Sequence, residues 1–343
     1  MQHHQGHIAL IGAGFAGLAL AFYLLSSKTL QAKVTIFHQD PLGSGASGVA
    51  SGLLHPFPAG ATHLSFQGFQ ALHEALTLIQ AVNAKATQPL YTPGGIIKLA
   101  LDDEDRKHFA DLGNKQQGLS YLSSEKVQKF LSMKNVCSGL LIEPGYTVYC
   151  KDYIQALTRM IQSLGGKFIH QAVENLDSLK DFDHTVVCAG AGVKKFSSKT
   201  KLQFVKGQIL TMEFPFKLLE KSLIGQGYIA LTQNPYIYHI GSSYEHHFTH
   251  TQPDLDVAKK KILDPWQKIF PEIGQGKMIS CDAGVRVMHP KNYLPCIERL
   301  NHKSWIFTAL GSRGLLYHAF LAKKLAHALE KDSLVDIPQE FLA

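Results

Sequence analysis

The sequence has few of the features that mark secreted, membrane-spanning or repetitive proteins. Cysteine is scarce, with five residues in a chain of 343, and no two of them form a C-x-x-C pair. An odd number of isolated cysteines argues against a disulfide framework and favours reduced thiols, which indicates a cytoplasmic protein. No apolar stretch is long enough to cross a bilayer, and we find no internal repeat or low-complexity segment.

Charge is also sparse, and only modestly one-sided. Charged residues make up 18% of the chain and the formal net charge is +7. The basic residues are spread along the sequence, so the surplus is compatible with an acidic cofactor, an acidic substrate or nucleic acid but requires none of them. A chain of 343 residues exceeds a usual single core, which predicts two domains or one domain with an inserted lobe.

The first functional motif lies where glycines interrupt the N-terminal apolar run. Residues Ile8–Ile11 have the character of a buried strand, three glycines follow with the spacing G-x-G-x-x-G, and a helical pattern continues to Leu25. In this context the glycines allow a tight turn, a close approach to pyrophosphate and close packing of helix on strand. The beginning of the helix offers N–H groups and partial positive charge to phosphates. The predicted dinucleotide-binding residues here are Gly12, Gly14, Phe15, Ala16 and Gly17.

The second predicted strand ends without the acidic residue that usually holds a ribose. Residues Lys33–Phe37 have strand character, and His38 follows where a dinucleotide-binding fold commonly has Asp or Glu. The imidazole can still hydrogen-bond a ribose hydroxyl, and Asp40 is an alternative two residues later. We therefore predict a cofactor contact at His38 but not a standard NAD site.

A run of small residues extends from Pro41 to Phe57. Its lack of bulk lets the backbone pass close to a large ligand, and its hydroxyl and N–H groups can hydrogen-bond that ligand. A merely flexible loop would not need the apolar pair Leu53–Leu54 directly after it. The expected ligand contacts are Gly45, Ala46, Ser47, Ser51, Gly52 and Leu53.

The order of these segments resembles the N-terminal signature of the D-amino-acid oxidase-like superfamily of FAD enzymes, which includes glycine and sarcosine oxidases. That signature is a G-x-G-x-x-G strand–helix turn, a second strand and then G-A-S, which here is residues 45–47. The resemblance implies FAD as the cofactor, lined by the small-residue run. The sequence HTVVCAGAG, residues 184–192, is similar to the strand that closes the FAD domain in the family. That similarity implies that Ala189 and Gly190 lie near the adenosine and Val173 near the adenine.

The C-terminal part continues the resemblance. The sequence AGVRVMHPKNYLPCIE, residues 283–298, is similar to the segment whose arginine binds the substrate carboxylate, which implies this role for Arg286. A structural ion pair is the alternative for that arginine. The family often has Asp where Asn292 stands. A loop and a long helix ending at Leu329 follow, and the family points the beginning of this helix at the flavin C2=O. The implied contacts are Gly311, Ser312, Arg313, Gly314 and Leu315.

The resemblance also implies the architecture, an α/β fold with a Rossmann-type FAD-binding lobe and a mostly antiparallel-sheet substrate lobe. The FAD-binding lobe is expected to be discontinuous, and short alternating strands between residues 208 and 241 favour the antiparallel lobe. The predicted limits are 1–82, 141–202 and 281–343 for the FAD-binding domain and 83–140 and 203–280 for the substrate domain. Helices are expected over 62–84, 102–114 and 153–164, and strands over 96–101, 168–176 and 184–188.

The leading functional hypothesis is an FAD-dependent oxidase or dehydrogenase of a C–N bond. A small amine or amino acid, such as an N-substituted glycine, would pass a hydride from its α-carbon to flavin N5, and the imine would then hydrolyse. A second hypothesis arises because G-S-R-G-L, residues 311–315, resembles the FAD domain of the bifunctional tRNA 5-methylaminomethyl-2-thiouridine biosynthesis protein. The substrate would then be a carboxymethylaminomethyl group on a tRNA wobble uridine. A third is a protein that binds FAD without turnover.

Two further side chains are candidates for the chemistry. His55 follows the small-residue run and could polarise the flavin or take a proton, although packing beside Pro56 explains it equally well. Among the tyrosines of the predicted antiparallel strands, we select Tyr238 as one that faces a pocket. The segment EHHFTH, residues 245–250, holds three histidines, but their spacing fits no common metal site and no metal is predicted.

Overall fold

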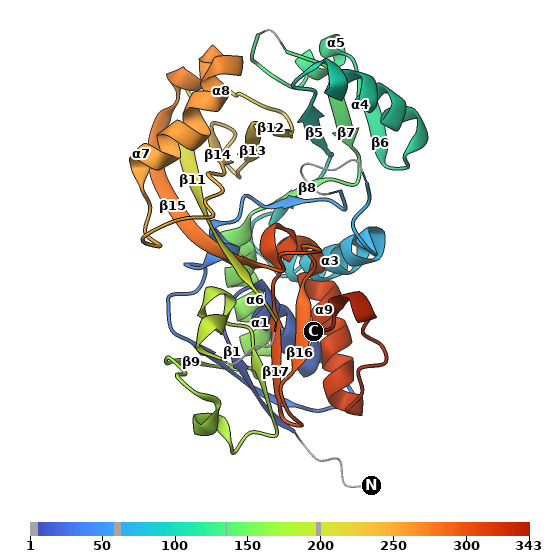
Figure 1. The fold of residues 1–343 in the computed structure, drawn as a ribbon, viewed down its shortest axis with the longest axis vertical. Helices are drawn as coiled ribbons and strands as arrows, with labels where there is room; N and C mark the ends of the chain where they lie inside the picture. Colours follow the sequence, from blue (N-terminus) through green and yellow to red (C-terminus); the bar gives the residue numbers. More distant parts are fainter. Residues whose placement is uncertain (1–5, 58–62, 135, 197–199) are drawn as a thin grey trace.

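Two β-sheets divide the molecule into two lobes, stacked along its long axis (Figure 1). The computed structural model describes residues 6–57, 63–134, 136–196 and 200–343. One sheet is mainly parallel and the other mainly antiparallel, which confirms the predicted fold class. The predicted helix start at Thr62 lies outside the described residues.

The lower lobe in Figure 1 is organised by a six-stranded sheet with the order β16-β17-β10-β1-β2-β9. Its strand pairs are parallel except β16 with β17, which is antiparallel. The central strands read as continuous apolar runs because both faces of the sheet are covered. The bounds are β1 (His7–Ile11), β2 (Lys33–His38), β9 (Lys167–His170), β10 (His184–Val187), β16 (Cys296–Arg299) and β17 (Ser304–Thr308).

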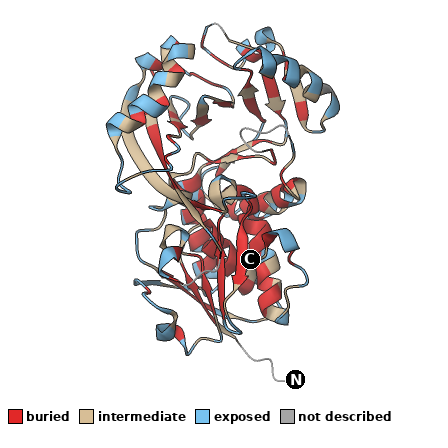
Figure 2. Cartoon of the chain, in the orientation of Figure 1, coloured by how far each residue is buried: buried red, intermediate tan, exposed pale blue. Residues whose placement is uncertain are grey.

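Four helices of the lower lobe pack on one another and share one apolar core, seen as the densely buried region of Figure 2. They are α1 (Phe15–Ser26), α3 (Gly68–Asn83), α6 (Cys150–Ser163) and α9 (Gly314–Lys331). The pairs α1–α9, α3–α9 and α1–α6 are in direct contact. Helices α1 and α9, from opposite ends of the chain, therefore lie side by side with their first turns at the same end of the lobe.

The upper lobe is built on an eight-stranded sheet with the order β15-β11-β14-β13-β12-β5-β7-β6. Every strand pair is antiparallel except β12 with β5. The two longest strands, β11 and β15, reach down from this sheet towards the lower lobe (Figure 1). The bounds are β5 (Ile96–Leu99), β6 (Leu119–Leu122), β7 (Gly139–Ile142), β11 (Gln203–Glu213), β12 (Ser222–Gly225), β13 (Gly227–Leu231), β14 (Ile237–Gly241) and β15 (Lys277–Met288).

Short elements complete both lobes. Helices α7 and α8 are joined by a π-helical stretch and cover one face of the upper sheet, while α4 and α5 lie beside β6. A small three-stranded sheet has the order β3-β8-β4. The bounds are α2 (Ala46–Val49), β3 (Leu53–Leu54), β4 (Tyr91–Thr92), α4 (Asp103–Lys115), α5 (Ser124–Gln128), β8 (Tyr146–Val148), α7 (Leu255–Ala258) and α8 (Asp264–Ile269).

The structure places the ends of several elements differently from the sequence-based expectations. The strand predicted over 168–176 ends at His170, because β2 ends at His38 and offers its last carbonyl to Gln171. Strands β7 and β15 run through positions 140/141 and 280/281, where the sequence places domain limits, and those limits stay a prediction. The small-residue run contains the single helical turn α2 and strand β3.

Candidate functional site

A cavity of about 2170 Å³ is lined by residues of both lobes. Pockets for small ligands usually measure about 300–1,000 Å³. The cavity therefore has room for a dinucleotide together with a second, smaller molecule. Its walls include the beginnings of α1 and α9, helix α2 and the lower halves of β11 and β15.

The turn between β1 and α1 has the backbone geometry that the glycine spacing predicts. Gly12 has a φ of 115°, and a β-carbon there would lie 2.3 Å from the carbonyl oxygen of Cys188. A β-carbon on Gly17 would lie 1.9 Å from the carbonyl oxygen of Gly12. The first glycine thus makes the turn, and the third lets the helix pack on it. The first N–H groups of α1 have no acceptor within the helix and lie at the cavity.

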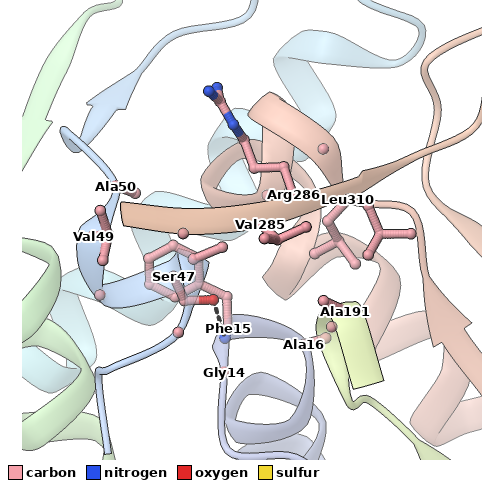
Figure 3. Close-up of a pocket in the computed structure, with 18 of the residues that line it drawn as sticks. Gly14, Phe15, Ala16, Ser47, Val49, Ala50, Ala191, Val285, Arg286 and Leu310 are labelled. Carbon is pink, nitrogen blue, oxygen red and sulfur yellow. Dashed lines mark hydrogen bonds between the residues drawn. The ribbon is translucent and has the colours of Figure 1, made fainter. Parts of the chain in front are cut away.

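Helix α2 closes over the beginning of α1. The hydroxyl of Ser47 accepts a hydrogen bond of 3.1 Å from the backbone N–H of Phe15, as Figure 3 shows. This bond joins the glycine motif to the small-residue run, which are separate segments of the sequence, at one wall of the cavity. The expected phosphate end of the ligand lies here, because helix N-termini attract anions.

The end of β2 carries His38 in place of an acidic residue. Its Nδ1 lies 3.0 Å from the carbonyl oxygen of Asp40, and its ring stacks on His170 with centroids 5.1 Å apart. Both His38 and Val173 line the cavity. Its neighbours thus hold the ring at the cavity, and the contact with a ribose hydroxyl stays a prediction.

The structure brings nearly all of the predicted cofactor-binding residues to this cavity, while their contact with a ligand stays a prediction. Gly17 is the exception, because it lies behind the turn and acts through packing. The predicted residues that line the cavity are Gly12, Gly14, Phe15, Ala16, His38, Gly45, Ala46, Ser47, Ser51, Gly52, Leu53, Val173, Ala189, Gly190, Gly311, Ser312, Arg313, Gly314 and Leu315.

Arg286 lies on β15 and extends away from Gly14 and the beginning of α1 (Figure 3). Its Nη2 donates a hydrogen bond of 2.8 Å to the hydroxyl of Ser242, and its guanidinium lies 5.3 Å from the ring centroid of Tyr244. The guanidinium also lies over Gly207 of β11, where a β-carbon would come within 2.1 Å of Nη2. Within the described residues, no carboxylate forms an ion pair with Arg286. Within the described residues, the guanidinium is thus positioned by a hydroxyl and an aromatic ring and not by a carboxylate.

Tyr228 adds a hydroxyl beside this guanidinium. It lines the cavity close to Arg286, Ser51 and Ser242. Burial raises the pKa of Tyr228 to about 12, so its hydroxyl stays protonated at neutral pH. A guanidinium and a phenolic hydroxyl facing one cavity can together bind a carboxylate.

The glycine under Arg286 leads to a testable prediction. In a Gly207→Ala variant the added methyl group would displace the guanidinium, which is the flexible end of a long side chain, so the fold should survive. We expect the KM for a carboxylated substrate to rise about tenfold, the effect of losing roughly 1.4 kcal/mol of charge-assisted bonding, with unchanged FAD content. Steady-state kinetics and the flavin absorbance of the purified variant test this. An unchanged KM would show that the guanidinium does not bind substrate from this position.

Comparison with known proteins places these observations in a family. Residues 7–328 match the family model described as FAD dependent oxidoreductase. The chain belongs to this FAD-dependent oxidoreductase family. The predicted cofactor and enzyme class are confirmed by this membership. The glycine turn, the open first turn of α1 and the cavity volume all fit FAD.

The family relatives include amino acid oxidases. The chain is 25% identical to a D-amino acid oxidase of Dugesia ryukyuensis over 288 residues, which cover 82% of both chains. It is 21% identical to a glycine oxidase of Geobacillus kaustophilus, covering 96% of this chain and 94% of that one.

Solved structures of the family share the fold. The glycine oxidase of Geobacillus kaustophilus aligns with a TM-score of 0.81 at 19% identity, covering 96% of this chain and 95% of that one. The iminodiacetate oxidase of Chelativorans sp. BNC1 aligns with a TM-score of 0.79 at 18% identity, covering 98% of both chains.

The structure corrects one predicted site residue of this oxidoreductase. Tyr238 lies in the apolar core under α7 and α8, is 0% exposed and does not line the cavity. Its hydroxyl accepts hydrogen bonds from the backbone of Leu218 and Leu219 and donates one to Pro235. Side chains of a strand alternate between its two faces, and Tyr238 lies on the face turned away from the cavity.

His55 does line the cavity, as predicted. Burial and the nearby positive charge of Lys98 lower its pKa to about 4, so the ring is neutral near pH 7. Its Nδ1 is buried and, within the described part of the chain, has no hydrogen-bond partner. The residue therefore presents a neutral ring and not a cation to the cavity near pH 7.

The next observations concern metal-binding groups and membrane-spanning helices. In the described ranges no group of three or more His, Cys, Asp or Glu could hold a metal ion, and His246 of the histidine-rich segment contacts Gln203 instead. No helix in those ranges is both long and apolar enough to cross a membrane.

A buried histidine joins α9 to α6 behind the cavity. His318 is 0% exposed, its Nδ1 lies 2.8 Å from the carbonyl oxygen of Leu315, and its Nε2 lies 2.9 Å from the hydroxyl of Tyr153. With Nδ1 donating to the carbonyl, Nε2 accepts from the tyrosine, which requires a neutral ring. Burial lowers the pKa of His318 to about 4.

We therefore expect His318 to make the protein sensitive to acid. Between pH 6.5 and pH 4 the unfolded chain binds a proton here that the folded chain does not, so stability falls as the pH falls. The loss from this residue between pH 7 and pH 4.5 should be on the order of 2–3 kcal/mol. Urea unfolding at both pH values compares the parent with His318→Gln, whose amide can still accept from Tyr153. An equal pH dependence in both proteins would contradict this prediction.

Proposed function

We propose that this enzyme oxidises the C–N bond of a small amine or amino acid that carries a carboxylate, such as an N-substituted glycine. The observation that supports it is the guanidinium of Arg286, held in a cavity without an ion-pair partner among the described residues and accompanied by the hydroxyl of Tyr228. A charge-assisted pair of this kind recognises a carboxylate by shape as well as by charge. The relatives named D-amino acid oxidase and glycine oxidase support the same substrate class.

The residues proposed to hold FAD divide along the cavity. We assign the pyrophosphate to the first turn of α1 and Ser47, the ribose to His38, and the adenine end to Val173 and Ala189. We assign the flavin to the small-residue run and the loop 311–315 that opens α9. When bound, FAD supplies the hydride acceptor for oxidation of the carbon beside nitrogen.

The chain itself supplies orientation. Arg286 and Tyr228 hold the carboxylate at one end of the substrate, which fixes the direction of the α-carbon relative to the rest of the cavity. Fixing the orientation of the substrate before the reaction reduces the entropy that the substrate would otherwise lose in reaching the transition state. His55 is proposed as a neutral hydrogen-bonding group beside the substrate amine, consistent with its lowered pKa.

Anaerobic bleaching of the flavin absorbance tests the proposal. The purified holoenzyme is mixed with glycine, N-substituted glycines, D-amino acids and matched amines that lack the carboxylate. We expect bleaching by at least one carboxylated compound and none by its decarboxylated counterpart. Bleaching only by amines without a carboxylate would overturn the assignment of Arg286.

A second candidate substrate is a carboxymethylaminomethyl uridine in tRNA. It is supported by the G-S-R-G-L loop lining the cavity at residues 311–315, and by the net charge of +7, which suits phosphate contacts. This group also ends in a carboxylate next to a secondary amine, so the same arginine would bind it. Including modified tRNA in the bleaching panel separates the two candidates. The free thiols of all five cysteines support a reducing compartment such as the cytoplasm, which suits either substrate.

A further inference from the structure

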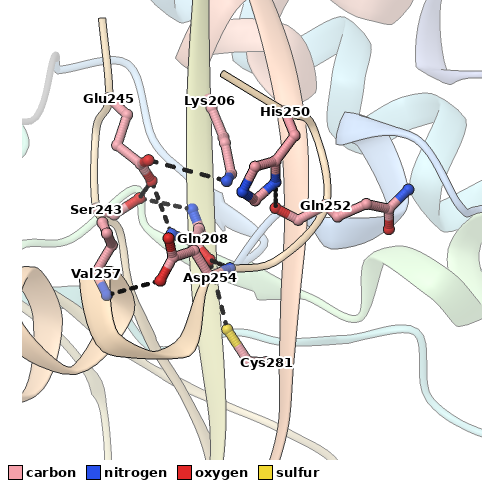
Figure 4. A network of polar contacts seen from close by, with 9 residues as sticks. All are labelled: Lys206, Gln208, Ser243, Glu245, His250, Gln252, Asp254, Val257 and Cys281. Carbon is pink, nitrogen blue, oxygen red and sulfur yellow. Dashed lines mark hydrogen bonds and ion pairs between the residues drawn. The ribbon is translucent and has the colours of Figure 1, made fainter. Parts of the chain in front are cut away.

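Behind the carboxylate site lies a buried polar network that the proposed chemistry does not use (Figure 4). The carboxylate of Glu245 accepts hydrogen bonds from Gln208 Nε2 at 2.9 Å and from Ser243 Oγ at 2.5 Å, and faces Lys206 Nζ at 3.9 Å. Lys206 is 2% exposed and Glu245 is 5% exposed. Removing two charges from water is unfavourable, so a pair like this tolerates little change in the position of either residue.

The backbone of the same segment is paired with β11. The N–H of Glu245 donates to the carbonyl of Lys206 at 2.7 Å, and the N–H of Lys206 donates back at 3.0 Å. Residues 242–245, which we call the bridging segment, thus continue alongside β11 where β14 ends at Gly241.

Side chains of the bridging segment contact two different groups in alternation. Ser242 accepts the hydrogen bond from Arg286, and the ring of Tyr244 lies under the same guanidinium. Ser243 and Glu245 belong to the buried network instead. One short stretch of backbone therefore connects the carboxylate site to the buried ion pair.

Strand β11 shows the same division between its faces. Gly207 lies against Arg286, while Lys206 and Gln208 project from the opposite face, as neighbours in a strand do. The side-chain oxygen of Gln208 also accepts a hydrogen bond of 2.6 Å from the backbone N–H of Asp254. The network thus ties both ends of the loop that follows β14.

We propose that Lys206, Glu245, Gln208 and Ser243 are positioning residues for the Arg286 site, a role that rests on the proposed function. They hold the bridging segment so that Ser242 and Tyr244 orient the guanidinium towards a carboxylate. Tyr244 has a φ of 48°, in the left-handed region that a non-glycine residue adopts only when its surroundings enforce it. The network provides that enforcement from the side away from the substrate.

The test uses Glu245→Gln in the holoenzyme, with acetate as the probe and acetamide as its uncharged match. This substitution keeps the size of the side chain and removes the charge that faces Lys206. We expect the Kd for acetate and the KM for the carboxylated substrate to rise about tenfold, with kcat changed less than threefold. Acetamide binding and FAD content should stay as in the parent. Changes in the flavin absorbance report both ligands.

Two further variants separate positioning from loss of stability. Ser243→Ala removes one hydroxyl of the network while leaving the ion pair, and should weaken acetate binding several-fold. It provides the test if Glu245→Gln does not fold. Thr147→Val is the matched control, because it breaks a buried hydrogen bond of 2.7 Å to Ser222 and neither residue lines the cavity. This control should lower the melting temperature without changing the acetate Kd.

Arg286→Lys, measured in parallel, distinguishes the two ways of failing. If Arg286→Lys weakens acetate binding and both network variants leave it unchanged, the positioning role is wrong and the proposed function stands. If Arg286→Lys itself leaves acetate binding unchanged, the carboxylate site is wrong and the positioning role falls with it. A loss of acetate and acetamide binding to the same extent in the network variants would indicate a general structural effect and also overturn the proposal.

Discussion

A Gly14→Val variant is expected to fold and to contain no FAD. A β-carbon on Gly14 would have only the side chain of Ser47 within 4 Å, at 3.0 Å from its hydroxyl, so a small shift of that one side chain accommodates it. The added branches would instead occupy the cavity at the beginning of α1, where the pyrophosphate needs to approach the backbone. Blocking that approach should abolish cofactor binding altogether.

Flavin absorbance of the purified protein measures the cofactor content, and circular dichroism shows whether the variant has folded. Gly274→Val provides a matched control, because a β-carbon there meets only Gln267 and the position lies outside the cavity. It should retain FAD like the parent. Full FAD occupancy in Gly14→Val would mean that the pyrophosphate is bound elsewhere.

Replacing Arg286 by lysine should raise the KM for a carboxylated substrate by about 10- to 100-fold. Lysine keeps the positive charge but loses the planar fork that can form two parallel hydrogen bonds with a carboxylate. The expected factor corresponds to the roughly 1.5–3 kcal/mol that a hydrogen bond to a charged group contributes. The shorter reach of the ammonium also removes the bond to Ser242 that now positions the guanidinium.

Steady-state kinetics with a carboxylated substrate and its decarboxylated counterpart test this prediction, because only the first should be affected. FAD content serves as the control for folding, since Arg286 projects away from the first turn of α1 (Figure 3). A KM that stays unchanged for every carboxylated compound would show that another residue binds the carboxylate.

Local sequence patterns were sufficient where neighbouring residues determine the structure. The strand–turn–helix of residues 7–26 follows from the spacing of its glycines and the apolar runs on either side. The cofactor cavity could also be anticipated, because the small-residue run and the loop 311–315 lack bulk in stretches that the family resemblance places beside the flavin. The end of β9 could not be read from sequence, because it depends on the length of its partner β2.

The tyrosines show where sequence reasoning reaches its limit. Tyr228, Tyr238 and Tyr244 all lie in or beside strands with similar composition, and alternation alone does not tell which face of a sheet meets a cavity. The face depends on where α7 and α8 pack, and they cover the side that holds Tyr238. Tyr228 and Tyr244 face Arg286 because they lie on the other side.

By itself, then, the sequence predicted the fold class and the cofactor through its resemblance to the family. It also predicted the glycine turn at the cavity, since that turn depends on backbone geometry encoded within a single segment. Only the tertiary structure decided how the proposed carboxylate site is assembled. Gly207, Tyr228 and Arg286 lie on β11, β13 and β15, and Ser242 directly follows β14. They meet because β11 pairs with β15 and β14, and β14 pairs with β13, each in a particular register. The register of paired strands is a property of the whole sheet, because it depends on which face is buried. It cannot be inferred from the sequence of any one of these segments.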